Sequence, residues 1–308
     1  MVIEILSFFT RQLLLGNVDV TLFVLRMKQV FGLMRLNPSK INSFLNSLTD
    51  SNRVDLLFCL FLVPDLSISP MITIKDNLEL IRTVSEEEIC TAIFHMNPYK
   101  APGPDGFEAS FYQQHWTILK EQLYAAIKDF FGLGKLLKEF NHAFITLIPK
   151  VDNSETTSQF RPISLCNTFY KFVAKILVNP LRLLLERIIH LTQSAFVPQR
   201  AIHDNILLAH EVINKFYHMK GKKGYVAVKL DMEKAYDRLE WDFLLQCLTH
   251  LGFHPIWINW IRECISTVPY SVLVKNEPCG FFKPTRGLRQ GDPLSPYLFF
   301  ICMNVLAQ

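Results

Sequence analysis

The chain has 308 residues, of which 50% are hydrophobic and 19% charged, enough for one large domain or two moderate ones. Its formal net charge of +4 and isoelectric point of about 8.6 agree with a nucleic-acid partner without singling one out. The seven cysteines include no C-x-x-C pair and their number is odd, which argues against a zinc ribbon and a disulfide framework. We expect mostly buried free thiols in a reducing compartment.

The apolar runs are too short to cross a membrane. The run Leu56–Val63 lies between Asp55 and Pro64, whereas a span needs about 20 residues. The first residues, Met1–Glu4, lack the basic start of a secretory signal. We therefore expect an intracellular protein, in the nucleus or the cytoplasm, with no membrane partner.

The first element with clear signals is a helix that begins at Ser85. Ser85 and Glu88 have the spacing of a capping box, and apolar residues recur at helical spacing up to Asn97. Prolines and glycines then predict a turn-rich loop over Lys100–Gly106. The next helix is predicted over Phe111–Phe131 and is closed by glycines.

The middle of the chain alternates between strand and helix patterns. β-branched apolar residues predict a strand over Ala143–Pro149, and a polar stretch separates it from Phe160–Leu165. A long amphipathic helix is predicted over Thr168–Ile189, interrupted by Pro180. Because a proline inside a helix costs about 3 kcal/mol, we expect a kink at this position.

The remaining elements are predicted in the order helix, strand, two helices, hairpin and helix. Their ranges are Asn205–Tyr217, Tyr225–Leu230, Glu240–Leu251, Pro255–Ile265, the hairpin strands Tyr270–Lys275 and Gly280–Lys283, and Tyr297–Leu306. This order predicts an α+β fold in which helices pack on one face of a mixed sheet.

One acidic residue occupies a position suited to metal chemistry. Asp231 follows directly on the predicted strand that ends at Leu230. A carboxylate at a strand end is a suitable Mg²⁺ ligand, because this ion prefers hard oxygen donors and keeps several waters. The alternative interpretation of Asp231 is a turn residue or a helix cap.

A second segment, Arg286–Pro296, is suited to contact with a ligand. Its Gly287 and Gly291 allow the backbone to approach a phosphate or a base closely. The alternative interpretation is a helix N-terminus, with Asp292 as the cap and Pro293 at the first helical position. The two interpretations are compatible.

Six blocks of the sequence carry a resemblance to a known family. They are Lys100–Gly106, Ile148–Lys150, Arg161–Ile163, Gln193–Arg200 with Asp204–Ile206, Lys229–Arg238 and Gly287–Pro296. In this order they resemble the lid loop, two finger motifs, the segment after them and two palm motifs of reverse transcriptases from plant LINE-type (non-LTR) retrotransposons. The resemblance implies a right-hand polymerase fold with fingers, an incomplete palm sheet with helices on one face, and no thumb.

The resemblance also implies an activity and its partners. Members of this family are RNA-directed DNA polymerases, which add dNTPs to the 3′-hydroxyl of a DNA primer on an RNA template. Two Mg²⁺ ions, or Mn²⁺ in their place, activate that hydroxyl and stabilise the leaving pyrophosphate. The implied partners are therefore template, primer, dNTPs and magnesium, and no particular protein partner is implied.

Site residues follow from the matching motif positions. Asp231 resembles the first metal-binding aspartate, with the backbone carbonyl of Met232 as a second metal ligand. Tyr236 matches the steric gate that rejects a 2′-hydroxyl, and its alternative is a core aromatic. We interpret Asp237 and Asp292 as structural. Positions matched to the nucleotide are Lys150, Arg161, Gln290 and Gly291, and positions matched to the template backbone are Lys100 and Arg200.

The sequence departs from the family pattern in three places. The third palm motif, an Asp-Asp hairpin, is expected beyond Gln308, so the chain is interpreted as truncated before it. Residues 85–308 form the predicted reverse transcriptase domain. Residues 1–84 have no clear assignment, and Phe8–Leu15 within them resembles a degraded, displaced copy of that hairpin. Pro180 stands where the family usually has arginine.

Two functional hypotheses follow. The first is the polymerase, for which the missing aspartates predict an inactive chain, because one carboxylate cannot hold two metal ions. The second is a non-catalytic retroelement remnant that at most binds nucleic acid through its fingers. A viral RNA polymerase or an intron-encoded maturase shares the palm chemistry, but the residues of Gly287–Pro296 and Lys100–Gly106 disfavour both.

Overall fold

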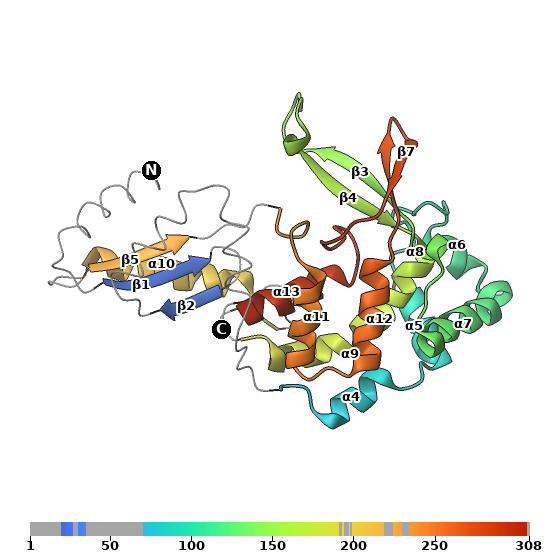
Figure 1. Ribbon diagram of the computed structural model, residues 1–308, viewed down its shortest axis with the longest axis horizontal. Coiled ribbons are helices and arrows are strands. Elements are labelled where there is room, and N and C mark those ends of the chain that lie inside the picture. The colour runs from blue at the N-terminus through green and yellow to red at the C-terminus, as the bar shows by residue number, and fades with distance from the viewer. Residues whose placement is uncertain are drawn as a thin grey trace. The chain divides into compact units, whose positions relative to one another are not determined.

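The computed structural model describes residues 20–26, 30–34, 70–190, 193, 197, 199–218, 224–229 and 234–306, which fall into two compact units (Figure 1). Unit 1 comprises residues 1–67, 190–233 and 306–308, and unit 2 comprises residues 68–189 and 234–305. Most of the described elements belong to unit 2. The division predicted at Ser85 stays a prediction.

Unit 1 contains a three-stranded sheet with the strand order β2-β1-β5. β1 (Val20–Arg26) is antiparallel to β2 (Val30–Met34) and parallel to β5 (Gly224–Lys229). Helix α10 (Ile202–His218) belongs to the same unit. The structure thus confirms the strand and the helix that the sequence predicts in this region, with small shifts of their bounds.

Unit 2 begins with five helices, of which the first has no counterpart in the sequence prediction. This helix opens with a capping box, because Asp76 N donates to Thr73 Oγ1 at 3.2 Å and Thr73 N donates to Asp76 Oδ2 at 2.8 Å. The helix is tied to the body of the unit, since Asn77 Nδ2 donates to Gly252 O at 2.7 Å. The five helices are α4 (Ile74–Ile81), α5 (Glu86–Phe94), α6 (Ala109–Gln114), α7 (Trp116–Leu133) and α8 (Lys138–Asn141).

The predicted start of α5 is confirmed by its capping geometry. Glu88 N donates to Ser85 Oγ at 3.2 Å, and Ser85 N donates to the Glu88 carboxylate at 3.0 Å. Ile89 and Ile93 are fully buried on the inner face of this helix. α5 ends at Phe94, three residues before the predicted stop at Asn97.

The single helix predicted over Phe111–Phe131 is divided in the structure. His115 separates α6 from α7, and its N–H donates to Phe111 O at 3.1 Å. The glycine that closes α7 is confirmed: Gly134 has φ +66° and its N–H donates to Phe130 O at 2.8 Å. Sequence periodicity does not reveal the break, because both helices present apolar residues at helical spacing.

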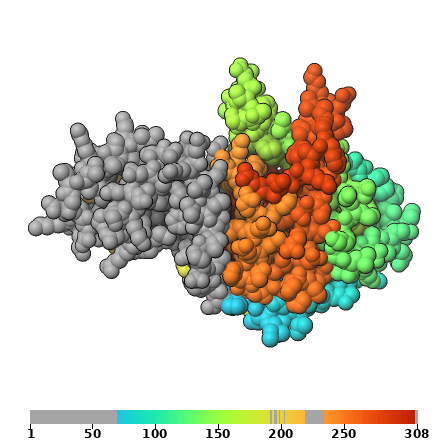
Figure 2. Space-filling view, in the orientation of Figure 1, coloured from blue at the N-terminus to red at the C-terminus, as the bar shows by residue number. Residues whose placement is uncertain are grey.

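A four-stranded sheet with the order β4-β3-β6-β7 projects from the helices of unit 2 (Figure 1). β3 (Ala143–Pro149) is antiparallel to β4 (Phe160–Cys166), and β6 (Tyr270–Val274) is antiparallel to β7 (Glu277–Phe282). β3 and β6 are parallel, but they pair only from Ala143 to Ile145 on the β3 side. The sheet therefore consists of two ribbons joined at their base, which Figure 2 shows as separate ridges.

The turn between β6 and β7 corrects the predicted hairpin. Lys275 and Asn276 both have positive φ, +52° and +67°, as a two-residue type I′ turn requires. The second strand consequently begins at Glu277 rather than at the predicted Gly280. Every residue of β7 is exposed.

The core of unit 2 forms around helix α9 (Thr168–Ile188), which contacts α4, α5 and α8. Tyr170, Phe172 and Leu177 are among its fully buried side chains. The other helices of the unit are α11 (Trp241–His250), α12 (Pro255–Ser266) and α13 (Ser295–Leu306). The predicted mixed α/β class is thus confirmed as a four-stranded sheet with helices.

Two sequence-based exclusions concern the chain as a whole. Four of the six described cysteines are buried, and none of the six forms a disulfide, as the sequence predicts. Within the described residues, no helix combines the length and the apolar character that a membrane span requires.

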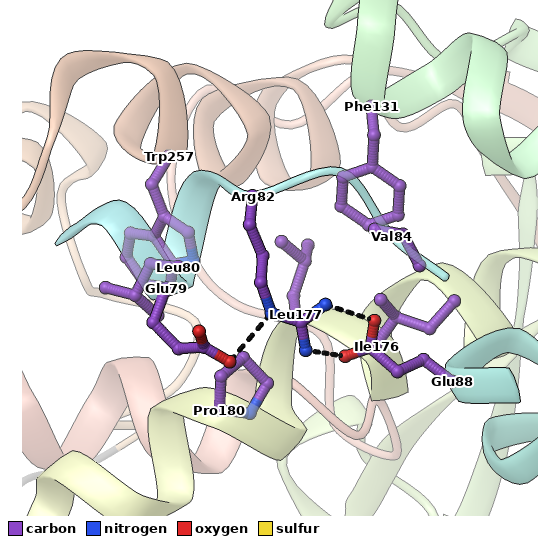
Figure 3. Close-up of a pocket in the computed structure, with 10 residues that line it drawn as sticks. All are labelled: Glu79, Leu80, Arg82, Val84, Glu88, Phe131, Ile176, Leu177, Pro180 and Trp257. Atoms are coloured by element: carbon purple, nitrogen blue, oxygen red, sulfur yellow. Dashed lines mark hydrogen bonds and ion pairs between the residues drawn. The ribbon is translucent and has the colours of Figure 1, made fainter. Parts of the chain in front are cut away.

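Helix α9 is continuous through Pro180, so the interruption predicted there is wrong. Proline has no N–H to donate to the carbonyl of Ile176, one turn earlier. The Pro180 ring lines a small pocket beside the Arg82 guanidinium (Figure 3). The charges of this pocket pair with each other, since Arg82 Nε donates to Glu79 Oε1 at 2.7 Å and Nη1 to Glu88 Oε2 at 2.6 Å.

Replacing Pro180 by alanine should stabilise the chain. Alanine restores the missing backbone donor within a helix that already has helical geometry, and the difference in helix propensity is on the order of 3 kcal/mol. The expected result is a higher free energy of unfolding for Pro180→Ala in urea denaturation. Leu183→Ala, on the same helix and 82% exposed, should change it by less than about 0.5 kcal/mol. A destabilised Pro180→Ala variant would contradict the expectation.

Candidate functional site

The site of unit 2 begins where two segments distant in sequence pair through their backbones. Gly287 N donates to Leu239 O at 2.7 Å, and Leu288 N donates to Tyr236 O at 2.8 Å. Trp241 Nε1 donates to Gly287 O at 2.7 Å. The residues that follow Asp231 in sequence are thereby fixed against the loop 286–292.

Gly287 is required by this close approach. Its φ is +91°, and a Cβ atom added to it would lie 2.9 Å from Asp237 O and 3.2 Å from Asp237 Cα. A side chain would therefore push the two segments apart at a backbone contact that cannot give way. The structure shows a close approach of Gly287 to the protein's own backbone, and the predicted approach to a ligand stays a prediction.

The same loop also lies against the outer edge of β4. Ser164 N donates to Gln290 O at 2.7 Å, so the loop satisfies a backbone donor of this edge strand. Gly291 has φ +108°, and a Cβ atom there would lie 3.0 Å from Ser164 O. The loop 286–292 is thus joined to the strand that contains Arg161–Ile163.

The buried guanidinium of Arg289 holds the loop 286–292 in place. The Arg289 side chain is 2% exposed, and its guanidinium lies 3.6 Å from the centre of the Tyr170 ring. Nη1 donates to Asn141 Oδ1 at 2.9 Å, and Nη2 donates to Cys264 O at 2.7 Å. Arg289 therefore connects the loop with α8, α9 and α12.

Asp292 completes this buried network, as its predicted structural role implies. Its carboxylate accepts hydrogen bonds from Tyr170 Oη at 2.8 Å, Ser295 Oγ at 3.1 Å and Leu294 N at 2.9 Å. Arg289 Nε lies 3.5 Å from Asp292 Oδ2. The following helix begins at Ser295, so the interpretation of Pro293 as its first residue is corrected by two positions.

Lys150 and Arg161 project from one face of the β3–β4 ribbon. Ile148 pairs with Arg161, and Lys150 N donates to Gln159 O at 2.8 Å. Because side chains alternate along a strand, Lys150 and Arg161 share a face as diagonal neighbours, typically separated by roughly 7–8 Å. Both are exposed, and Lys150 Nζ donates to Ser158 O at 2.8 Å.

Asp237 connects the ribbon and the loop electrostatically. Burial raises the pKa of its carboxyl, and the Lys234 charge, a hydrogen bond from the Gln290 side chain and the Lys150 charge oppose this rise. Two residues matched to the nucleotide, Lys150 and Gln290, thus act on one carboxylate. Asp237 keeps the structural role predicted for it, with Gln290 as its neighbour.

Tyr236 is half-buried and stacks on the ring of Phe299. Their centroids are 4.7 Å apart, with an angle of 14° between the ring planes. Burial, followed by the negative charge of Asp292, raises the pKa of the Tyr236 hydroxyl, so this group stays protonated at neutral pH. The stacking fixes the ring orientation, which a steric gate and a core aromatic both require.

The loop 100–106 is docked on the start of α9. Lys171 Nζ donates to Ala101 O at 2.6 Å, and Asn167 Oδ1 accepts from Asp105 N at 3.0 Å. A Cβ atom at Gly103 would lie 2.3 Å from Asn167 N, so only glycine fits there. Lys100 itself is exposed.

The remaining predicted residues do not belong to the described part of unit 2. Arg200 belongs to unit 1, where Nη1 donates to His190 O at 2.7 Å and to Gln193 O at 2.8 Å. Asp231, Met232 and the segment Phe8–Leu15 lie outside the described residues. Among those that are described, no group of three His, Cys, Asp or Glu side chains could hold a metal ion.

The buried network that supports the site was not predicted from the sequence. Arg289, Tyr170 and Asn141 are all buried and bonded to one another or to the loop, yet none was singled out. The one sequence signal is the three-residue spacing of Arg289 and Asp292, which suits an ion pair. That spacing does not reveal burial, because burial depends on α8, α9 and α12 meeting around it.

Comparison with known proteins covers the part of the chain that carries this site. A family model described as "Reverse transcriptase (RNA-dependent DNA polymerase)" matches residues 148–308. That range begins at the end of β3 and includes the loop 286–292.

Curated relatives from several animals match most of the chain. The "Transposon TX1 uncharacterized 149 kDa protein" of Xenopus laevis is 29% identical over 243 residues, which are 76% of this chain and 18% of that protein. The "Retrovirus-related Pol polyprotein from type-1 retrotransposable element R2" of Nasonia vitripennis is 29% identical over 214 residues, 67% of this chain and 19% of that protein. The "Putative 115 kDa protein in type-1 retrotransposable element R1DM" of Drosophila melanogaster is 25% identical over 72% of this chain. The chain spans 18% to 21% of the length of these relatives.

Substituting alanine at Gly287 should destabilise the chain more than the same change at Gly280. Both glycines have positive φ, but a Cβ atom at Gly280 meets nothing within 4 Å. Gly280→Ala should therefore cost about 1–2 kcal/mol for the left-handed backbone alone. Gly287→Ala adds the contact with Asp237, about 1–3 kcal/mol more. Urea denaturation measures the difference, and equal losses would argue against the close approach.

Replacing Arg289 by methionine should be strongly destabilising. The substitution leaves the buried Asp292 carboxylate without its cation, a change that typically costs about 3–5 kcal/mol. Arg286→Met is the matched control, because Arg286 pairs with Glu240 at 3.0 Å on the surface, where such pairs contribute about 0–1 kcal/mol. Thermal unfolding of the two variants gives the comparison. Similar unfolding temperatures would show that Arg289 is not needed to hold the loop.

Proposed function

Because the chain belongs to the reverse transcriptase (RNA-dependent DNA polymerase) family, with relatives among non-LTR retrotransposons, we propose that it forms the fingers and part of the palm of an RNA-directed DNA polymerase. One observation supports this most directly. The loop that contains Gln290 and Gly291 is bonded to β4, and β4 with β3 presents Lys150 and Arg161 beside it. Residues matched to the nucleotide from three motifs thus form one cluster in unit 2.

Lys150 and Arg161 would hold the triphosphate of the incoming nucleotide. Their spacing on one ribbon face suits a chain of phosphates, with Arg161 as a planar fork and Lys150 as a point charge. Both side chains are exposed and therefore accessible to a ligand. The carboxylate of Asp237 lies near Lys150 and balances part of its charge while no ligand is bound.

Tyr236, Gln290 and Gly291 would contact the rest of the nucleotide. Tyr236 is fixed by Phe299 on one side, which suits a wall against a ribose 2′-hydroxyl. Gly291 keeps the loop free of a side chain next to β4, and Gln290 supplies an amide at the same place. The template strand would contact Lys100 and Arg200.

Asp231 would bind the catalytic metal, with the carbonyl of Met232 as a further ligand. A carboxylate and a carbonyl are hard oxygen donors and fit Mg²⁺, while Mn²⁺ accepts the same ligands. When bound, the two metal ions of this chemistry activate the primer hydroxyl and stabilise the leaving pyrophosphate. The protein's own part is to position the triphosphate through Lys150 and Arg161.

A non-catalytic, nucleic-acid-binding role is the second candidate function. The observation in its favour is that the sequence contains no two adjacent aspartates, so Asp231 is the one carboxylate matched to the metal pair. The 308 residues by themselves would then bind nucleotide or RNA without extending a primer.

A plant lineage is part of the proposal, supported by 57% identity over 35 residues with the "Uncharacterized mitochondrial protein AtMg01250" of Arabidopsis thaliana.

Binding of a fluorescent dNTP in the presence of Mg²⁺ tests the proposed nucleotide site. Lys150→Gln combined with Arg161→Gln should weaken binding at least about tenfold, because each charge-assisted contact contributes about 1.5–3 kcal/mol. Lys275→Gln combined with Lys283→Gln removes the same charge from the β6–β7 ribbon and its end and should leave binding unchanged. Equal effects of the two double variants would reject a specific triphosphate site.

Primer extension then separates the two candidate functions. The purified chain is given an RNA template, an annealed DNA primer, dNTPs and Mg²⁺. Extension that Asp231→Ala abolishes would establish catalysis by these residues and rule out the non-catalytic role. Nucleotide binding without extension would support the non-catalytic role for the 308 residues.

A further inference from the structure

A row of cations follows helix α9 and the turn 97–100 of unit 2; Lys100 and Arg182 are exposed, and Lys175 is half-buried. Lys175 and Arg182 are seven residues apart on α9, which places them on one face about 10 Å apart along the helix axis. Among the described residues, no carboxylate oxygen lies within 4.0 Å of the charged nitrogens of Lys100, Lys175 or Arg182. Arg187, further along α9, differs in this respect because it pairs with Asp76.

Lys175 connects the helix to the turn. Its Nζ donates to His95 O at 2.7 Å, at the end of α5. The turn follows two residues later, where Lys100 N donates to Asn97 O at 3.3 Å. This hydrogen-bonded turn therefore places Lys100 beside Lys175.

Lys100 and Arg182 both act electrostatically on Lys175. Burial lowers the pKa of Lys175, and the charges of Lys100 and Arg182 lower it further. Cations that repel one another in this way are stabilised by an anion that binds between them.

An exposed aromatic ring lies within the same turn. Tyr99 is 79% exposed, and its N–H donates to Asn97 Oδ1 at 3.0 Å, which fixes the backbone that carries the ring. Tyr99 directly precedes Lys100. Exposed aromatic rings that alternate with cations are the combination by which proteins bind single-stranded nucleic acid, since bases stack on the rings and phosphates meet the charges.

The turn and the helix form one continuous surface. Lys171 Nζ donates to Ala101 O at 2.6 Å, and Thr168 Oγ1 donates to Phe107 O at 2.6 Å. These bonds hold the loop against α9 on both sides of Gly103. A strand bound to Tyr99 and Lys100 would consequently meet Lys175 and Arg182 without rearrangement.

We propose that Tyr99, Lys100, Lys175 and Arg182 form a binding track for single-stranded RNA, with a base stacked on Tyr99 and phosphates on the three cations. The choice of RNA rests on the proposed function, whose template it would be. The track adds Tyr99, Lys175 and Arg182 to the template contact expected at Lys100. No motif assigns a role to these three residues. It favours single strands over duplexes, because a base inside a duplex offers no free face to Tyr99.

Fluorescence anisotropy with the 308-residue chain tests this proposal. The probes are a short labelled RNA of mixed sequence and the blunt duplex of the same sequence, each titrated over a series of salt concentrations. Lys175→Gln combined with Arg182→Gln should weaken single-strand binding and reduce the slope of log K against log salt by about 1.4, or about 0.7 for each phosphate contact. Arg182→Gln alone should give half of that reduction.

Tyr99→Ala should produce a different signature. Loss of one stacked base weakens single-strand binding at least about fivefold, while the salt slope stays unchanged because no charge is removed. Tyr99→Phe should bind like the parent chain, since it retains the ring. The duplex should respond little to either substitution at Tyr99.

The matched control removes two charges elsewhere. Lys120→Gln combined with Lys128→Gln changes α7, where these lysines already pair with Glu121 at 3.6 Å and Glu86 at 3.2 Å. This variant should retain the parent affinity and salt slope. Equal losses in the control and in the α9 variant would overturn the track in favour of general charge attraction.

The outcomes distinguish this proposal from the proposed function. RNA binding that is unaffected by substitutions at Tyr99, Lys175 and Arg182 overturns the track alone. The same conclusion follows if the chain binds dNTP but no RNA at low salt. Failure to bind either ligand overturns the track and the proposed function together.

Discussion

The buried guanidinium of Arg289 is the interaction on which the arrangement of the candidate site depends. A charge removed from water is tolerated only when its hydrogen-bonding groups are satisfied. Here Asn141 and the Cys264 carbonyl accept from it, the Tyr170 ring lies over it, and Asp292 balances its charge. Each partner comes from a different part of unit 2, so the loop 286–292 has one position in which the charge is satisfied. The helices around α9 therefore determine where that loop lies.

The chemistry-bearing residues are then placed by this loop through backbone contacts. Gln290 O bonds β4 on one side, and Gly287 and Leu288 bond the segment 236–239 on the other. Both contacts are between main-chain groups, and the two glycines keep them short. Lys150 and Arg161, which are exposed, are thus not needed for the packing of the core, whereas the Gln290 side chain forms a hydrogen bond with Asp237. This division separates the residues that fold the site from those available to a ligand, and it is favourable for precise positioning.

The sequence predicted most elements of unit 2 but not how they meet. Ser85 and Glu88 placed the start of α5 correctly because capping is local, and Gly134 closed α7 for the same reason. The break at His115 and the continuity of α9 through Pro180 were not predicted from the sequence, because both depend on tertiary packing that overrides helix propensity. Motif matching brought Lys150, Arg161, Tyr236, Gln290 and Gly291 together as a set, and the structure places them in one unit. The support from Arg289 and Tyr170 could not be predicted, because neither residue type is expected to be buried in isolation. Roles for Asp231 and Met232 remain predictions, as these residues lie outside the described part.

The hydrogen bond from Lys150 Nζ to the Ser158 carbonyl has a consequence for affinity. A free lysine side chain has about 2 kcal/mol of rotamer entropy, and a ligand that orders it must overcome that loss. In this ribbon much of the ordering has already taken place before any ligand arrives. A phosphate oxygen carries more negative charge than a neutral carbonyl, so it can replace Ser158 as the acceptor with a small movement of the ammonium group. The tip of the β3–β4 ribbon thus preorganises the ammonium group of Lys150.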